Sequence, residues 1–276
     1  MALNLMYITN NEKTAKIAEE SGVDWIFIDL ELNGKEERQG HLDTVISRHN
    51  ITDVIKIKKV LKNSKLLVRV NPIYEGSKEE IDTVIKDGAD IVMLPFFKDA
   101  AEVKTFLDYV DGRVKTCLLL ETPEAVNNVD EILKLKGIDY IHIGLNDLHL
   151  GYKLKFMFEL LSNGVVENLC NKFKERKLTY GFGGIAQLGN GDLSSEYIIG
   201  EHYRLGSSMA ILSRSFCDTK KLKEEEKIKN IFSKGIKDIR NYEKSLKNKD
   251  NKFYDDNNRT IKEKVLKIVA IINKED

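Results

Sequence analysis

The sequence predicts a (β/α)₈ barrel followed by a charged helical extension. Short apolar segments alternate with amphipathic segments roughly eight times over about 220 residues, which is the size of such a barrel. The apolar segments are nearly continuous runs, as expected of parallel strands that are buried on both faces. A doubly wound open sheet is the alternative, but it favours a glycine-rich turn after the first strand, and residues 8–14 (ITNNEKT) contain no glycine.

Each predicted strand is an apolar run that ends in a polar residue or a turn-forming residue. Asp29, Asn71, Pro95 and Glu121 follow or close four of these runs. The predicted strands are residues 3–8, 25–30, 66–70, 90–94, 116–120, 140–145, 179–186 and 204–212.

The predicted helices lie between these strands and have apolar residues at helical spacing. Asn10 and Asn11 are typical helix caps, and Gly22 is a typical helix end. The predicted helices are residues 12–20, 52–61, 77–86, 99–110, 123–135, 156–177 and 195–202.

The composition changes after Asp218, so we predict a barrel domain over residues 1–218 and a helical extension over residues 219–276. Two helices are expected in the extension, separated by a polar stretch at residues 248–259. One reading is a solvated appendage; the other is packing on a neighbouring subunit in a homo-oligomer. We favour the second because an apolar stripe needs burial. This stripe consists of Ile261, Val265, Ile268, Val269 and Ile272.

The charge balance argues against nucleic-acid and membrane partners. Lys and Arg together number 44, as do Asp and Glu, which gives a formal net charge of zero. Cys117, Cys170 and Cys217 are widely spaced, so neither a zinc site nor a disulfide framework is indicated. The chain has no secretory leader pattern and no run approaching the roughly 18 apolar residues of a membrane helix. We therefore expect a cytoplasmic protein.

Two acidic residues follow consecutive predicted strands, Glu121 after residues 116–120 and Asp147 after residues 140–145. Parallel strands joined by a helical crossover have their carboxyl ends on the same side of the sheet. The two carboxylates are therefore expected at one mouth of the barrel, where they would repel each other. A divalent cation such as Mg²⁺ or Mn²⁺ between them would balance this charge.

The neighbouring strands add an arginine and a third acid to this mouth. Asp29 closes the second strand, and Arg69 lies at the end of the third. A guanidinium group binds a carboxylate or an oxyanion in a planar fork. A metal and an arginine together are what is needed to bind a 2-oxo acid and stabilise its enolate. Gly183 and Gly184 are predicted to let a substrate approach the backbone, although tight barrel packing is an alternative.

Other residues near the mouth are less informative. A Schiff-base aldolase needs a lysine there, but Lys65 and Lys115 lie at strand beginnings. His41 and His49 flank the polar loop at residues 33–50, and we interpret both as solvated. His142 is predicted to face the helices as a structural residue.

The chain resembles the HpcH/HpaI aldolase/citrate lyase family over about residues 20–215. GLNDL and LETPEA are the more specific of five matching segments, and all five occur in the order found in that family. The matching segments are FIDLE, RVN, ADIVMLP, LLLETPEAVNN and IDYIHIGLNDL.

The resemblance implies a TIM barrel of the phosphoenolpyruvate/pyruvate-binding superfamily. It implies Mg²⁺ or Mn²⁺ on Glu121 and Asp147, and Arg69 holding the keto or enolate oxygen of a pyruvate-like group. The family cleaves or forms carbon–carbon bonds in 2-oxo acids or acyl-CoA thioesters. Its C-terminal helices commonly pack on neighbouring subunits.

One position departs from the family pattern. Where the aldolase branch carries a histidine after the acidic pair, this chain has Leu32. The main expectation is a metal-dependent carbon–carbon lyase with Asp29 in proton transfer. Two alternatives are a non-catalytic metabolite-binding or scaffold barrel, and a phosphoenolpyruvate-type mutase or transferase.

Overall fold

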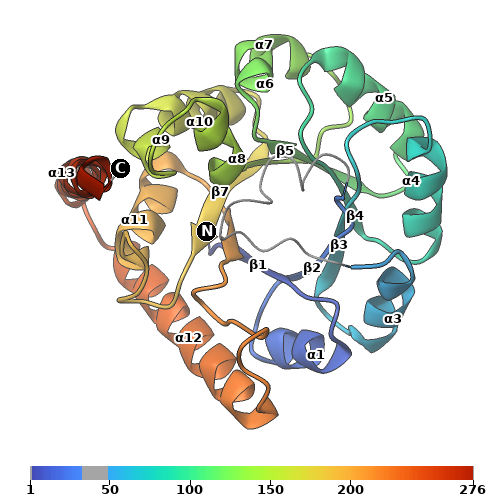
Figure 1. The fold of residues 1–276 in the computed structure, drawn as a ribbon, viewed down its shortest axis with the longest axis horizontal. Helices are drawn as coiled ribbons and strands as arrows, with labels where there is room; N and C mark the ends of the chain where they lie inside the picture. Colours follow the sequence, from blue (N-terminus) through green and yellow to red (C-terminus); the bar gives the residue numbers. More distant parts are fainter. Residues whose placement is uncertain (1, 33–48, 276) are drawn as a thin grey trace.

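A computed structural model describes residues 2–32 and 49–275 of the chain. The described strands form a closed, all-parallel barrel in sequence order, surrounded by helices (Figure 1). This confirms the predicted (β/α)₈ fold and excludes the open sheet. The strands are β1 (Asn4–Ile8), β2 (Trp25–Asp29), β3 (Lys65–Arg69), β4 (Ile91–Leu94), β5 (Lys115–Leu120), β6 (Tyr140–Ile143), β7 (Thr179–Ile185) and β8 (Met209–Leu212).

The helices follow the predicted order but differ in several bounds. Asn11 caps the first helix as expected, since its side chain accepts a hydrogen bond from the Thr14 amide at 2.9 Å. The helices are α1 (Glu12–Glu20), α3 (Thr52–Val60), α4 (Ser77–Lys86), α5 (Ala100–Val110), α6 (Pro123–Asn127), α7 (Val129–Ile132), α8 (Leu145–Gly151), α9 (Glu159–Ser162), α10 (Val165–Glu175), α11 (Ser195–Leu205), α12 (Glu225–Leu246) and α13 (Asn251–Glu275).

Two predicted helices and one predicted break between helices were wrong in detail. The segment 123–135 is divided at Asn128 into α6 and α7, and residues 156–177 form α9 and α10 instead of one helix. The stretch 248–259 was predicted to separate two helices, but α13 already begins at Asn251. This charged stretch is helical because α13 buries a residue about once per turn, Asn257, Ile261 and Val265, against α9 and α11.

The strands divide the apolar core into two layers. Side chains of alternate strand residues fill the barrel, and the others pack under the helices. The inner layer consists of Met6, Trp25, Phe27, Leu67, Ile91, Met93, Cys117, Leu119 and Met209. Asp29, Arg69 and Glu121 continue the inward-facing positions of their strands, so this alternation carries polar side chains to the carboxyl-end mouth.

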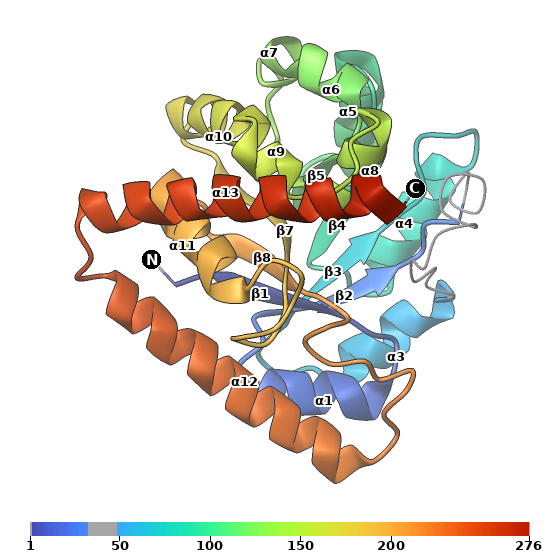
Figure 2. The same ribbon diagram turned by 60° about the vertical axis from the view of Figure 1, so that its left-hand side comes forward.

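The C-terminal extension packs on one side of the barrel (Figure 2). The helix α12 lies against α1, and α13 lies against α11 and α9. Phe232 and Ile239 of α12 are buried, as are Ile261 and Val265 of α13. Among the helices that the structure describes, none is long and apolar enough to cross a membrane.

Candidate active site

An ion pair joins the carboxyl ends of β2 and β3. Asp29 and Arg69 are register partners in the sheet, and Arg69 Nε donates to Asp29 Oδ1 at 2.8 Å. Arg69 Nη1 lies 3.2 Å from Glu31 Oε2. Both acids are almost fully buried, and the Arg69 side chain is 11% exposed. The guanidinium is therefore fixed in one orientation, with two carboxylates on one side of it.

Arg69 stays protonated although it is buried. Burial by itself lowers the pKa of Arg69, but the carboxylates of Asp29, Glu31 and Glu121 outweigh this effect and raise the pKa above its ordinary value. Phe27 lies below the guanidinium, with the central carbon 5.6 Å from the ring centroid. The arginine is a permanent cation at the barrel mouth.

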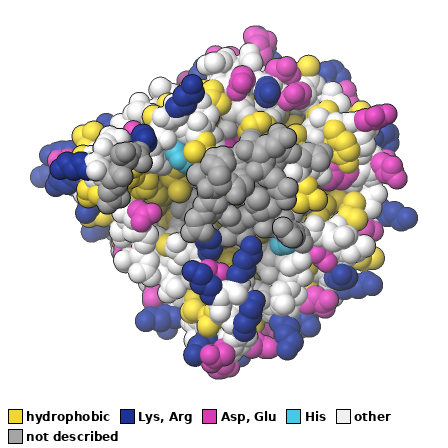
Figure 3. Space-filling view, in the orientation of Figure 1, with side chains coloured by type: hydrophobic (Ala, Val, Ile, Leu, Met, Phe, Trp, Pro, Cys, Tyr) yellow, Lys and Arg dark blue, Asp and Glu magenta, His cyan; other side chains and the backbone are white. Residues whose placement is uncertain are grey.

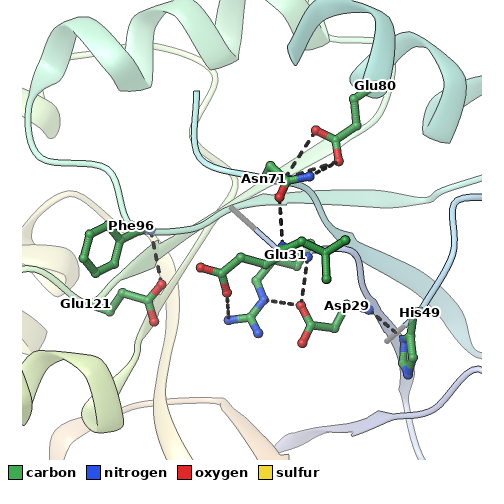
Figure 4. Close-up of polar contacts among 9 residues, drawn as sticks. Asp29, Glu31, His49, Asn71, Glu80, Phe96 and Glu121 are labelled. Carbon is green, nitrogen blue, oxygen red and sulfur yellow. Dashed lines mark hydrogen bonds and ion pairs between the residues drawn. The ribbon is translucent and has the colours of Figure 1, made fainter. Parts of the chain in front are cut away.

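Glu121 lies on the opposite side of this mouth (Figure 4). Its Oε1 accepts a hydrogen bond from the Phe96 amide at 3.2 Å, and Phe96 has a left-handed backbone with φ of 51°. A Cβ atom on Gly144 would lie only 2.6 Å from Glu121 Oε2. Glycine at the start of the GLNDL motif therefore gives the Glu121 carboxylate its space.

Asp147 lies in the first turn of α8, not directly at a strand end as its sequence position suggested. The strand β6 ends at Ile143 and α8 begins at Leu145, and Gly144 between them lies close to Glu121. Asp147 is 8% exposed. Within residues 2–32 and 49–275, no group of three or more His, Cys, Asp or Glu side chains is arranged to hold a metal ion.

Gly183 has a left-handed backbone with φ of 55°, and its carbonyl accepts a hydrogen bond from His142 Nε2 at 3.1 Å. A β-bulge lies between Gly181 and Gly184. A Cβ atom on Gly183 would lie 2.7 Å from Leu145 Cδ1, so close packing at the β6–β7 boundary explains at least this glycine. The predicted substrate-binding role of Gly183 and Gly184 stays a prediction.

His142 was expected to face the helices, but the barrel alternation places it on the inner side. Tyr140 packs with the inner layer, whereas Ile141 and Ile143 pack with the outer one. The prediction assumed that side chains alternate between the two faces from His142 as far as Asp147. This was wrong because β6 ends at Ile143 and Asp147 lies in α8. His142 is fully buried, and burial lowers its pKa to about 4, so it is neutral at pH 7.

Two residues near the mouth were undervalued by sequence reasoning. Glu31 follows Asp29 by two positions, a spacing that could have predicted its pairing with Arg69. His49 was interpreted as solvated, but its Nδ1 accepts a hydrogen bond from the Asp29 amide at 3.0 Å. No local pattern predicts this contact, because His49 and Asp29 are 20 positions apart in the sequence.

A further hydrogen bond holds the backbone of Leu32 against β3 and α4. The Leu32 amide donates to Asn71 Oδ1 at 2.9 Å, and Asn71 Nδ2 donates to Glu80 at 2.8 Å (Figure 4). The Leu32 side chain is 51% exposed. The basic residues Lys35 and Arg38 and the histidine His41 lie outside the described residues.

Comparison with known proteins identifies the family. The family model for HpcH/HpaI aldolase/citrate lyase matches residues 4–157, more than half of the chain. The chain belongs to this family. A search of curated proteins gave no match.

Solved structures show the same fold. An HpcH/HpaI aldolase from Desulfitobacterium hafniense DCB-2 aligns with a TM-score of 0.59 and 16% identity, over 77% of this chain and 86% of that one. An HpcH/HpaI aldolase/citrate lyase family protein from Burkholderia cenocepacia J2315 gives 0.61 and 14%, over 80% and 92%. The citrate synthase SbnG gives 0.59 and 15%, over 77% and 85%.

Membership of this family supports a lyase-type activity on a small molecule such as a 2-oxo acid. The identities to the solved structures are low, so those structures inform the fold alone. The residues that would carry the chemistry follow from the geometry of this chain.

Proposed function

We propose that the protein is a metal-dependent carbon–carbon lyase that acts through an enolate held beside Arg69. The observation that carries the proposal is the buried Asp29–Arg69–Glu31 cluster, with the charge of Glu121 acting on the same guanidinium. Such a cation lowers the energy of a developing enolate oxygen in a site that largely excludes water.

Arg69 and Asp29 have separate roles in this proposal. The hydrogen bond from Nε to Asp29 and the ion pair of Nη1 with Glu31 hold the guanidinium plane, and Nη2 is the proposed donor for a substrate oxygen. Asp29 positions a water molecule or takes part in proton transfer, since its carboxylate lies beside the Arg69 guanidinium at the carboxyl ends of the strands. Gly183 and Gly184 are proposed to line the substrate side of the β7 end.

The donor set fits a Mg²⁺ or Mn²⁺ ion on Glu121 and Asp147. Both residues supply the carboxylate oxygens that these cations prefer, and Gly144 leaves Glu121 Oε2 clear of a side chain. The family is generally dependent on a divalent metal. When bound, such an ion polarises a carbonyl oxygen and balances the charge of the enolate.

The substrate class in this proposal is a 2-oxo acid or an acyl-CoA thioester. The exposed Leu32, at the place where the aldolase branch has a histidine, motivates a second candidate: a barrel that binds such metabolites without turning them over. A phosphoenolpyruvate-type reaction would instead require phosphate for binding.

Proton exchange in pyruvate tests the enolate chemistry without a guess at the second substrate. Incubation with pyruvate and Mg²⁺ or Mn²⁺ in D₂O is expected to remove the methyl proton signal in NMR spectra. Glu121→Gln should abolish the exchange and weaken Mn²⁺ binding, measured by electron paramagnetic resonance. Glu124→Gln makes the same chemical change at an exposed position nearby and should leave both unchanged.

The outcomes separate the candidates. Exchange that survives in Glu121→Gln with bound metal would contradict the metal assignment. Absence of exchange in the wild type, together with tight binding of oxalate, would favour the non-catalytic barrel.

We further propose that the extension 219–276 packs on a second copy of the chain. Leu266 and Ile271 of α13 are 69% and 57% exposed, whereas Ile261 and Val265 of the same helix are buried against the barrel. Light scattering should report an oligomer, and Leu266→Glu with Ile271→Glu should shift it toward the monomer. A monomeric wild type would contradict this proposal.

A further inference from the structure

Basic side chains gather at the edge of the mouth, over the loop between β8 and α12 and over α1 (Figure 3). The loop covers residues 213–224 and begins where β8 reaches the carboxyl end of the barrel. Its basic residues exceed its acids, Asp218 and Glu224. The basic residues are Arg214, Lys220, Lys221 and Lys223.

The middle of this loop is tied to the barrel wall. Tyr7 of β1 donates from its hydroxyl group to the Cys217 carbonyl at 3.0 Å, and the same oxygen lies 3.4 Å from Thr219 Oγ1. Phe216 is fully buried, and its ring packs edge-on against Phe232 at 5.5 Å between centroids. The loop is therefore held near the carboxyl end of β1 and does not need a ligand to become ordered.

None of the described ion pairs joins a lysine of this turn to Asp218, the acid of the same turn. Asp218 Oδ1 accepts hydrogen bonds from the amides of Lys220 and Lys221, at 3.1 and 3.4 Å. Its carboxylate therefore faces the backbone. Lys220 and Lys221 are exposed, and no described carboxylate forms an ion pair with either.

Two of the three acids at the start of α12, Glu224 and Glu225, form ion pairs with other lysines, and the third, Glu226, is exposed. Glu224 lies 2.7 Å from Lys227 Nζ, and Glu225 lies 3.0 Å from Lys13 Nζ. Lys223 Nζ donates to the Thr219 carbonyl at 3.1 Å, which keeps this third lysine over the same turn. The turn thus carries a local positive charge beside the mouth, in a chain with a formal net charge of zero.

We propose that Lys220 and Lys221, with Lys223, bind the phosphate groups of a substrate whose carbonyl end reaches Arg69. The proposal rests on the proposed function and narrows its substrate class to molecules that carry a phosphate away from the reacting carbons. Lysine ammonium groups suit a phosphate as point charges. Two substrate types share this chemistry: a nucleotide-bearing thioester and a phosphorylated aldehyde.

Paired ligands test the assignment by isothermal titration calorimetry. Acetyl-CoA is compared with S-acetylpantetheine, and glyceraldehyde 3-phosphate with glyceraldehyde. In one pair, the wild type should bind the phosphorylated member about tenfold more tightly, and this preference should fall at high salt. Lys220→Glu with Lys221→Glu should remove the preference. Lys234→Glu with Lys237→Glu, at exposed positions of α12, makes the same charge change and should retain it.

A preference for acetyl-CoA would indicate a nucleotide-bearing thioester, and a preference for glyceraldehyde 3-phosphate would indicate a phosphorylated aldehyde. No preference in either pair, or a preference that survives in Lys220→Glu with Lys221→Glu, would overturn the inference. Pyruvate carries no phosphate, so wild-type proton exchange reports on the proposed function separately. Exchange without phosphate preference would reject the loop assignment alone. A preference for glyceraldehyde 3-phosphate without exchange would reject the pyruvate enolate chemistry and keep the loop assignment.

Discussion

Two buried arginine–carboxylate clusters in this molecule have similar chemistry but different surroundings. At the mouth, Arg69 pairs with Asp29 and Glu31 from the adjoining strand and loop. On the barrel exterior, Arg204 of α11 pairs with Glu201 of the same helix at 2.9 Å and with Glu167 of α10 at 2.7 Å.

The partners of the second cluster explain its role. The Glu201 carboxylate also accepts hydrogen bonds from Asn257 and Asn258 of α13, at 3.4 and 3.2 Å. A Cβ atom on Gly200 would lie 2.8 Å from Asn257 Nδ2, so α11 and α13 are in close contact here. This cluster joins three helices, whereas the Arg69 cluster lies at the carboxyl ends of the strands, where barrel enzymes act.

The largest expected difference between the clusters is in catalysis. Arg69→Lys removes the planar donor fork and should slow pyruvate proton exchange by about 10²–10³-fold, the usual cost of losing an oxyanion donor. Arg204→Lys is the matched change in the exterior cluster and should leave the rate per folded molecule unchanged. Equal rates for wild type and Arg69→Lys in the NMR assay would contradict the proposed clamp.

The next effect is on stability. Glu201→Ala leaves Arg204 with Glu167 as its described acidic partner and removes the Glu201 acceptor of Asn258. Asn257 then keeps the Tyr197 carbonyl as an acceptor at 3.0 Å. We expect the free energy of unfolding to fall by about 3 kcal/mol, measured by urea denaturation. Glu263→Ala, at an exposed position of α13, serves as the control. A loss no greater than in this control would show that the cluster does not hold α13.

The smallest effect concerns two buried histidines, His142 on β6 and His202 on α11. Burial lowers the pKa of His142 to about 4; burial and then His142 lower the pKa of His202, on α11, to about 3. The unfolded chain binds these protons near pH 6.5, and the folded chain does not. Stability is therefore complete above pH 6.5 and falls as the pH drops toward 4, by about 1.4 kcal/mol per pH unit for each histidine.

Urea denaturation between pH 7 and pH 4.5 measures this slope. His142→Gln and His202→Gln should each reduce it by about half, which shows how the inner and outer positions share the acid sensitivity. An unchanged slope in both variants would contradict the assignment to these residues.

The sequence by itself determined the barrel and the general position of the site. Buried strands of a parallel barrel need continuous apolar runs, and such runs can be recognised without tertiary information. Alternation from Trp25 and Phe27 to Asp29, and from Leu67 to Arg69, was enough to predict which side chains reach the mouth. The ends of two consecutive predicted strands gave the expectations for Glu121 and Asp147, and the family motifs implied the same two residues.

Only the tertiary structure decided the contacts between distant segments. The hydrogen bond from the Asp29 amide to His49 joins residues 20 positions apart, which no local pattern relates. The orientation of His142 depends on where β6 ends, which local sequence leaves open within a few residues. The continuous α13 and the tie between Tyr7 and the lysine-bearing turn depend on neighbouring elements. A charged or irregular segment has little preference of its own, so the surfaces that it meets determine its conformation.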